Sequence, residues 1–260
     1  MHGRLRRSLV WALLTGCLAA VVAYQTTRPL AAAGEPRVFV PSPVYYEKLP
    51  ESWQLTVADT YWLYLIQYYG EHIRGDYRFD SLPELLDLVT TLSPHWERPY
   101  LFGAYALLDM DRGRGRPDLS YELLERGYAE NPDDWRIPFN LGIFAYWFGA
   151  KLPQLEGQDK DQVAAQWMDA AAKLPGHLPI IPRLAADLYS KGDDTALAVA
   201  LLAQAYTEGD DNSKAGAVAD LKELLRARPK KRQEILDQLK SSLPRDTYDG
   251  LVTQLSGGEQ

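Results

Sequence analysis

The chain has 260 residues, a formal net charge of −7 and a hydrophobic fraction of 46%. This length fits one helical domain with an additional N-terminal segment, and the negative charge argues against a dedicated nucleic-acid binder. The single cysteine, Cys17, excludes an intrachain disulfide. Apolar residues recur with helical spacing almost throughout and no stretch shows sustained strict alternation, so we expect an all-α fold.

The N-terminal residues predict a targeting or anchoring segment. Three arginines, at positions 4, 6 and 7, precede an apolar run from Leu9 to Tyr24, and basic residues of this kind stay on the cytoplasmic side of a membrane. We therefore expect residues 1–33 to form a signal or transmembrane helix with its basic flank. Residues 8–27 would contact the membrane, and the rest of the chain would lie outside the cytoplasm.

Three fates remain open for this segment. The first is a retained anchor, because the apolar run of sixteen residues is only slightly shorter than the usual ~20. The second is cleavage after the small residues Ala31-Ala32-Ala33. The third is lipidation of Cys17, because Leu14-Thr15-Gly16-Cys17 resembles the bacterial lipobox. The expected location is the bacterial inner membrane with the bulk of the chain in the periplasm; a cleaved periplasmic protein and a lipoprotein are the alternatives.

Residues 34–52 follow as a spacer. They contain four prolines, Pro36, Pro41, Pro43 and Pro50, and proline favours an extended, semi-rigid backbone. Helical repeats are then expected over residues 53–210.

The first expected helix, Trp53 to His72, is dense in aromatic residues. Its candidate partner-binding residues are Tyr61, Trp62, Tyr64, Tyr68 and Tyr69. They fall on two faces of the helix, and a helix that is apolar on two faces either packs between neighbours or offers one face to a partner. Tyrosine and tryptophan are enriched among interface anchors, so this helix is a candidate wall of a peptide-binding groove, with core packing as the alternative.

A turn between two helices is predicted around Asn131-Pro132. Pro132 cannot continue the helix that ends near Glu130. In the next helix, Gly142 removes a side chain where two helices approach, and Tyr146 lies one turn further on the same face. The spacing from Trp135 to Gly142 is repeated upstream between Trp96 and Gly103.

These residues together resemble the tetratricopeptide repeat, in which a second helix and an Asn-Pro turn precede a first helix with Trp, Leu-Gly and Tyr. The two Trp positions differ by 39 residues, against roughly 34 in the standard repeat. Weaker copies are expected at Trp53–His72 with Leu82–Leu92, and from Pro175 with a second helix over Thr195–Thr207. The residues that carry repeat packing would be Trp96, Gly103, Trp135, Leu141, Gly142 and Tyr146.

The resemblance implies an antiparallel helix-pair solenoid that acts as a binding scaffold. Lys151 to Lys160 interrupts the pattern as an insertion, and residues 211–260 are expected to form capping helices with a polar outer face and a tail.

Catalysis is not expected. The four histidines show no metal-ligand spacing, and Asp59 and His72 would lie about 20 Å apart on one helix. No cofactor and no metal are predicted.

The expected function is a scaffold that binds a peptide or helix of another envelope protein and supports assembly of a secretion, pilus or transport complex. A non-catalytic accessory module of a cell-wall enzyme and a cytosolic repeat protein are the alternatives.

Overall fold

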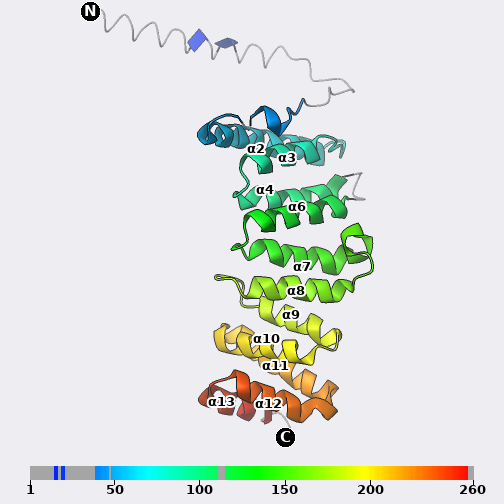
Figure 1. The fold of residues 1–260 in the computed structure, drawn as a ribbon, viewed down its shortest axis with the longest axis vertical. Coiled ribbons are helices and arrows are strands. Elements are labelled where there is room, and N and C mark those ends of the chain that lie inside the picture. Colours follow the sequence, from blue (N-terminus) through cyan, green and yellow to red (C-terminus); the bar gives the residue numbers. More distant parts are fainter. Residues whose placement is uncertain (1–14, 17–18, 21–38, 47, 111–114, 257–260) are drawn as a thin grey trace, which may run out of the picture. The chain divides into compact units, whose positions relative to one another are not determined.

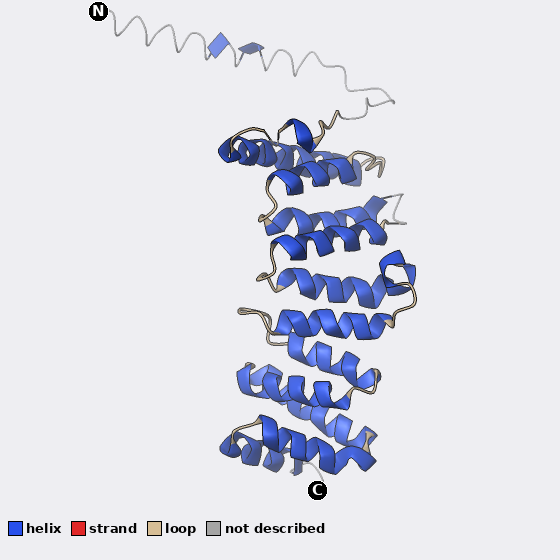
Figure 2. Cartoon of the chain, in the orientation of Figure 1, coloured by secondary structure: helices blue, strands red, loops and turns tan. Residues whose placement is uncertain are grey.

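The structure, a computed structural model, describes residues 15–16, 19–20, 39–46, 48–110 and 115–256. Contacts divide the chain into unit 1, Met1–Phe39, and unit 2, Val40–Gln260. Every regular element in the described part of the chain is helical (Figure 2). The all-α fold expected from the hydrophobic periodicity is therefore confirmed.

The α-helices of unit 2 follow one another in chain order (Figure 1). They are α2 (Glu51–Ile73), α3 (Leu82–Leu92), α4 (Glu97–Ala106), α6 (Pro117–Glu130), α7 (Arg136–Phe148), α8 (Lys160–Ala172), α9 (Ile181–Lys191), α10 (Thr195–Glu208), α11 (Asp211–Ala227), α12 (Arg232–Ser242) and α13 (Arg245–Ser256). Helices α2 to α11 pack mainly on neighbours in the sequence, most closely α2 on α3, α7 on α8, α8 on α9, and α9 on α10, whereas α12 packs mainly on α10 and α13 on α11. Packed adjacent pairs of this kind are compatible with a helical repeat.

Side-chain caps and prolines determine where several helices begin. The backbone N–H groups in the first turn of a helix have no partner within that helix. In α8, α10 and α11 some of these groups donate hydrogen bonds to the side-chain carboxylates of Asp159, Asp194 and Asp210, respectively. Pro117 and Pro182 lie at the first turns of α6 and α9, where a missing N–H costs nothing.

The turn at Asn131 joins two successive helix pairs. Its side-chain amide donates to the carbonyl of Pro94 at 3.0 Å and to that of Gly127 at 3.1 Å. Nδ1 of His95 also lies 2.9 Å from the carbonyl oxygen of Glu130. The Ser93-Pro94 turn and the Asn131-Pro132 turn therefore lie against each other.

Two glycines mark close approaches between helices. A Cβ atom on Gly103 would lie 2.5 Å from Leu86 of α3 and 2.7 Å from Leu123 of α6. A Cβ atom on Gly142 would lie 2.7 Å from Cγ of Met168 on α8. All three distances are shorter than carbon atoms tolerate, so a side chain at either position would force its neighbours to shift.

The interruption after α7 is part of the core. It forms two 3-10 turns, η3 (Gly149–Lys151) and η4 (Pro153–Leu155), and both Leu152 and Leu155 are buried in the main hydrophobic cluster. Residues 151–160 therefore fill space beside the helices while adding length to the repeat.

Arg228 links the end of α11 to the turn between α9 and α10. Its guanidinium donates to the carboxylate of Asp193, the hydroxyl of Thr195 and the carbonyl of Ser190. Because three acceptors on one turn meet one planar donor, this contact fixes the relative position of the two helix pairs.

Unit 2 begins within the range expected as a spacer. Val40 and Tyr46 pack on the cluster formed by Ala58 of α2 and Leu88 and Leu92 of α3, and a 3-10 turn, η1 (Pro43–Tyr45), contacts α3.

Among the described residues, none of the helices has both the length and the apolar character needed to cross a membrane. Cys17 and nearly all of the expected membrane segment, residues 8–27, lie outside the described residues. The anchor therefore stays a prediction from sequence.

Candidate functional site

The predicted aromatic residues of α2 separate into three environments. Tyr68 is buried, donates to the carbonyl of Arg78 and accepts from the backbone N–H of Ser81, both at 3.1 Å. Tyr61 lies beside Tyr46, and burial together with that hydrogen-bonded contact raises its pKa to about 12. Tyr61 therefore attaches the segment that precedes α2 to this helix, and Tyr68 attaches the segment that follows it.

Trp62 and Tyr69 pack between α2 and α4. The ring of Trp62 meets Trp96 at a centroid distance of 5.3 Å and Phe102 at 5.4 Å, both edge to face, which is a favoured arrangement for aromatic pairs. The hydroxyl of Tyr69 donates to Oδ2 of Asp109 at 2.6 Å. Burial and this carboxylate raise the pKa of Tyr69 to about 12. The second aromatic face of α2 is therefore a contact between successive helix pairs.

Tyr64 alone among the five predicted residues is classed as exposed, and it lies on the side of α2 that also carries exposed Trp53 and Leu63. Sequence reasoning did not single out Trp53 or Leu63 as exposed.

The residues expected to carry repeat packing lie inside or beside the core. Leu141 is fully buried, and Trp135 is half-buried against Phe139. Tyr146 is half-buried, with Nζ of Lys160 lying 5.0 Å from the centroid of its ring. Trp96, Gly103 and Gly142 occupy the contacts described above.

A surface that the sequence did not indicate is formed by α4 and α7. Exposed or half-buried side chains follow the spacing of one face of α7: Arg136, Asn140, Ile143 and Trp147. Tyr105 of α4 joins this row because its hydroxyl donates to Oδ1 of Asn140 at 2.5 Å. We call these five residues the Tyr105–Trp147 surface.

Two large aromatic rings remain open to solvent on this surface. Tyr105 is 50% exposed and Trp147 is 70% exposed, although both belong to well-packed helices. Tyr105 is held by its bond to Asn140 and by an edge contact with Phe144 at 5.6 Å, and burial of its phenol group raises its pKa. Trp147 meets Tyr146 edge to face at 5.3 Å. The rings are therefore positioned by the core without being covered by it.

Paired charges border one end of the Tyr105–Trp147 surface. Arg136 lies 2.5 Å from Oδ2 of Asp134 and 3.1 Å from Oε1 of Glu97 on α4. Burial opposes the ionised form of Asp134, but the hydrogen bonds from Arg136 outweigh it and lower the pKa of that carboxyl. The same contact raises the pKa of Arg136. The result is a fixed edge of paired charges beside the aromatic rings.

A separate cavity of about 370 Å³ lies between α9, α10 and α11. Arg183 and Asp220 pair across it at 2.7 Å, and Arg183 lies over Gly216, where a side chain would collide with the guanidinium. Lys191 pairs with Asp187 on its rim. Each of these two pairs neutralises its own charge; Glu223 of α11 also lines the cavity.

Within the described residues, no group of three or more His, Cys, Asp or Glu side chains is arranged to hold a metal ion. Comparison with protein-family models, with curated proteins and with solved structures finds no match for this chain. Functional inference therefore depends on the geometry of the described surfaces and on the sequence.

Proposed function

We propose that this chain is an exported, membrane-anchored helical scaffold of tetratricopeptide type. It binds a peptide or a helix of another envelope protein through the Tyr105–Trp147 surface and thereby supports assembly of a multiprotein envelope complex. The resemblance around Trp96–Gly103 and Trp135–Tyr146 supports the repeat type, and the packed adjacent helix pairs are compatible with it.

The observation that carries the proposal is the exposure of two aromatic rings on packed helices. Burying a half-exposed tyrosine or tryptophan stabilises a complex through its large apolar area, and such residues are over-represented among the few that dominate binding energy. Because Tyr105 and Trp147 are already oriented by their neighbours, little side-chain entropy is lost when a partner covers them.

The geometry limits the partner. Asn140, which holds Tyr105, and Trp147 are seven residues apart on α7, which is about 10 Å along the helix axis. A partner helix offers apolar residues at that spacing seven positions apart, whereas a peptide in the polyproline II conformation offers them three positions apart, at about 9 Å on one face. Between the anchors, Ile143 supplies apolar contact and the paired charge of Arg136 supplies polar contact at the edge.

Binding is tested by capture from native membranes. A photo-crosslinking amino acid placed at Ile143 should capture a discrete envelope protein that mass spectrometry identifies, and purified partner should then bind the full chain. Trp147→Ala and Tyr105→Ala should each weaken that binding by about 1–4 kcal/mol with little effect on helicity. Leu197→Ala, at an exposed position on α10, is the matched control and should leave binding unchanged. Equal affinity in all three variants would refute this surface as the binding site.

Export is tested separately. A C-terminal alkaline phosphatase fusion should be active, because the three N-terminal arginines precede an apolar run; an inactive phosphatase together with a bright cytoplasmic fluorescent fusion would contradict export. Cys17→Ser should leave membrane retention intact if residues 8–27 form the anchor, and should abolish it if a lipid on Cys17 does so.

A further inference from the structure

The side of α2 that faces away from α3 and α4 carries large exposed apolar side chains among the neutral polar residues Thr56, Thr60 and Gln67. Trp53 is 63% exposed and Leu63 is 64% exposed, with Tyr64 also open. Trp53 and Tyr64 are eleven residues apart, so they project within about 20° of each other around the helix. Beyond its first turn α2 has two exposed acidic residues, Asp59 and Glu71. Asp59 projects about 40° from Leu63, and Glu71 projects in about the same direction as Trp53 but about 27 Å further along the helix axis.

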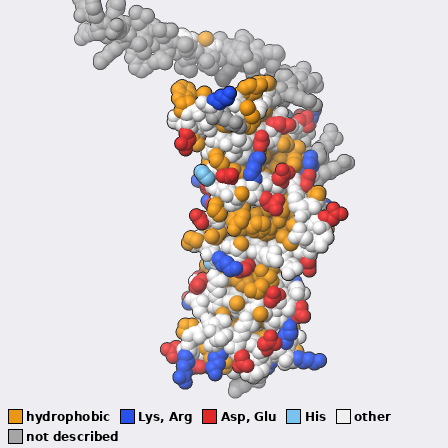
Figure 3. All heavy atoms as spheres, in the orientation of Figure 1, with side chains coloured by type: hydrophobic (Ala, Val, Ile, Leu, Met, Phe, Trp, Pro, Cys, Tyr) orange, Lys and Arg blue, Asp and Glu red, His pale blue; other side chains and the backbone are white. Residues whose placement is uncertain are grey.

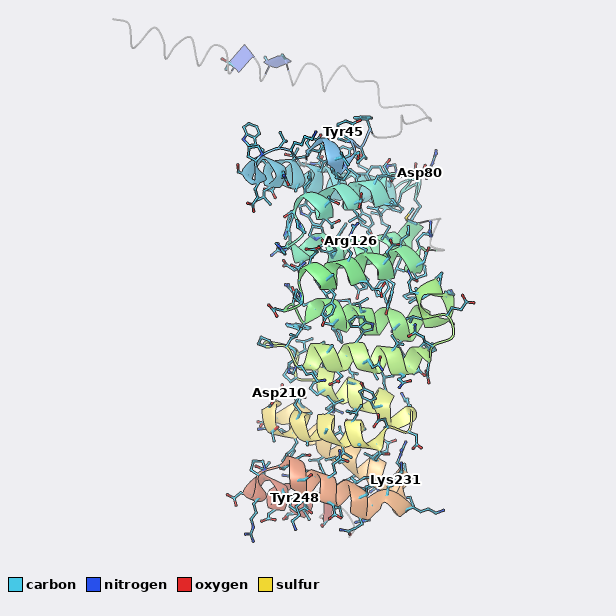
Figure 4. The ribbon with its side chains drawn as sticks, in the orientation of Figure 1. Tyr45, Asp80, Arg126, Asp210, Lys231 and Tyr248 are labelled. Atoms are coloured by element: carbon cyan, nitrogen blue, oxygen red, sulfur yellow. The ribbon has the colours of Figure 1, made fainter. Side chains whose placement is uncertain are left out.

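The turn that precedes α2 adds to this surface. Tyr45 of η1 is 75% exposed and Val44 is also exposed. Figure 4 labels Tyr45 at the end of unit 2 where α2 lies, and Figure 3 shows apolar side chains gathered at that end. We call Val44, Tyr45, Trp53, Leu63 and Tyr64 the end surface. It differs from the Tyr105–Trp147 surface in helix, in direction and in having almost no paired charge.

We propose that the end surface docks on the interfacial region of a lipid bilayer. The proposal rests on the membrane anchor that forms part of the proposed function. Twelve residues, 28–39, separate the expected membrane segment from Val40, and they span at most about 40 Å when fully extended. The end surface is therefore held within reach of the bilayer that holds the anchor.

The residue types fit the headgroup region of a bilayer. Tryptophan and tyrosine concentrate at membrane–water interfaces, because the ring enters the apolar boundary while the N–H or O–H stays hydrated. Weak membrane signals become a stable attachment when two act together. The described charged residues on or beside this surface are Lys48, Glu51, Asp59 and Glu71. Acidic residues outnumber the single lysine, so the docking depends on the apolar and aromatic side chains and is expected on zwitterionic lipid.

A second copy of the chain is the competing occupant of this surface. A stable dimer needs about 800 Å² of surface from each partner, and it must form at the concentration that the membrane provides. The tether instead delivers the end surface to lipid at an effective concentration that does not depend on how much protein is present. Lipid is therefore the favoured occupant.

The test uses the full chain in phosphatidylcholine vesicles, with and without brominated acyl chains. Cys17 is the only cysteine, so Cys17→Ser gives a background in which single cysteines are labelled with the fluorophore NBD. Leu63→Cys places the label on the end surface, and Leu197→Cys places it at an exposed leucine of α10 as a matched control. Flotation of the vesicles reports the anchor independently of the fluorescence.

Docking predicts that brominated lipid quenches the label at position 63 and leaves the label at position 197 almost unchanged. Adding Trp53→Ala and Tyr45→Ala to the Leu63→Cys chain should restore most of the fluorescence, which shows that the aromatic residues hold the surface on the lipid.

Three results would overturn the docking. Equal quenching at both positions in a chain that floats refutes it while leaving peptide binding at Tyr105 and Trp147 intact. If the label at position 63 is shielded from water but is not quenched by brominated lipid, and if this shielding increases with the protein density on the vesicles, the surface binds a second copy of the chain. If the chain does not float with the vesicles, the result refutes both the membrane anchor and the docking.

Discussion

Replacing Gly142 with alanine sets two effects of opposite sign against each other. Alanine is favoured over glycine inside a helix by about 0.8–1 kcal/mol, because the unfolded glycine backbone has more freedom to lose. The added methyl group, however, would lie 2.7 Å from Cγ of Met168, 3.1 Å from the backbone oxygen of Ala164 and 3.3 Å from the backbone nitrogen of Met168. The thioether side chain can move, but the backbone of α8 can yield only if the helix shifts.

Inserting a methyl group into a close-packed contact of this kind costs about 1–3 kcal/mol. Subtracting the gain in helix propensity leaves an expected net loss of about 0–2 kcal/mol. Gly250→Ala isolates the propensity effect, because Gly250 lies within α13 and a Cβ atom there meets nothing within 4 Å. That variant should therefore gain about 0.5–1 kcal/mol.

The free energy of unfolding is measured for both variants from urea titrations followed by circular dichroism at 222 nm, on the full chain in one detergent buffer. The informative quantity is the difference between the two variants, which should be about 1–3 kcal/mol with Gly142→Ala the less stable. If Gly142→Ala stabilises the chain as much as Gly250→Ala does, then α7 and α8 do not approach closely at this glycine and the assigned register is wrong.

Three further predictions concern caps and ion pairs. Asp159→Ala removes the side chain that accepts from the N–H groups of Asp161 and Gln162, and should lower the free energy of unfolding by about 1 kcal/mol in the same titration; no loss would mean that the cap is not formed. Arg228→Ala removes the shared donor of three acceptors in the α9–α10 turn, of which Asp193 and Thr195 keep only the more distant Lys231, and should cost about 1.5–3 kcal/mol; a loss no larger than that of exposed Arg226→Ala would contradict the contact. The guanidinium of Arg116 lowers the pKa of Asp118 below its ordinary value of 3.8, so this pair stabilises the fold above that pH and the contribution disappears as pH falls further. Unfolding midpoints of Asp118→Asn should therefore depend less on pH between 6 and 3 than those of the parent, and parallel curves would refute the pairing.

The helices were largely predictable because their signals are local. Pro132 and Gly142 specify a turn and a close approach through properties of single residues, and α10 begins and ends within a residue of the expected Thr195–Thr207. Helix α8 was not predicted, since its alanine-rich stretch has weak periodicity and follows an interruption. What makes it a helix is the Asp159 cap together with packing against α7 and α9.

The candidate surface was less predictable than the fold. The aromatic residues of α2 attracted attention by their density, yet Trp62 and Tyr69 are occupied by α4, and only the three-dimensional arrangement reveals that occupation. Tyr105 and Trp147 come from different helices and meet through Asn140, a contact between residues 35 positions apart in the chain. The residue spacing of α7 shows from sequence that Arg136, Asn140, Ile143 and Trp147 share one face of the helix. It does not show which faces of a helix are left exposed after the helices pack.

The contact between Trp62 and Trp96 has a spectroscopic consequence. Two indole rings whose centroids are 5.3 Å apart and whose planes are inclined at 64° couple their electronic transitions. Such a pair gives a paired positive and negative band in the circular dichroism spectrum that isolated tryptophans lack. Because one indole belongs to α2 and the other immediately precedes α4, the band should vanish when the first helix pair separates from the second, even while the remaining helices keep their signal at 222 nm. Phenylalanine at either position would remove the band and so serves as the control. The tryptophan pair thus reports local opening at the N-terminal end of unit 2.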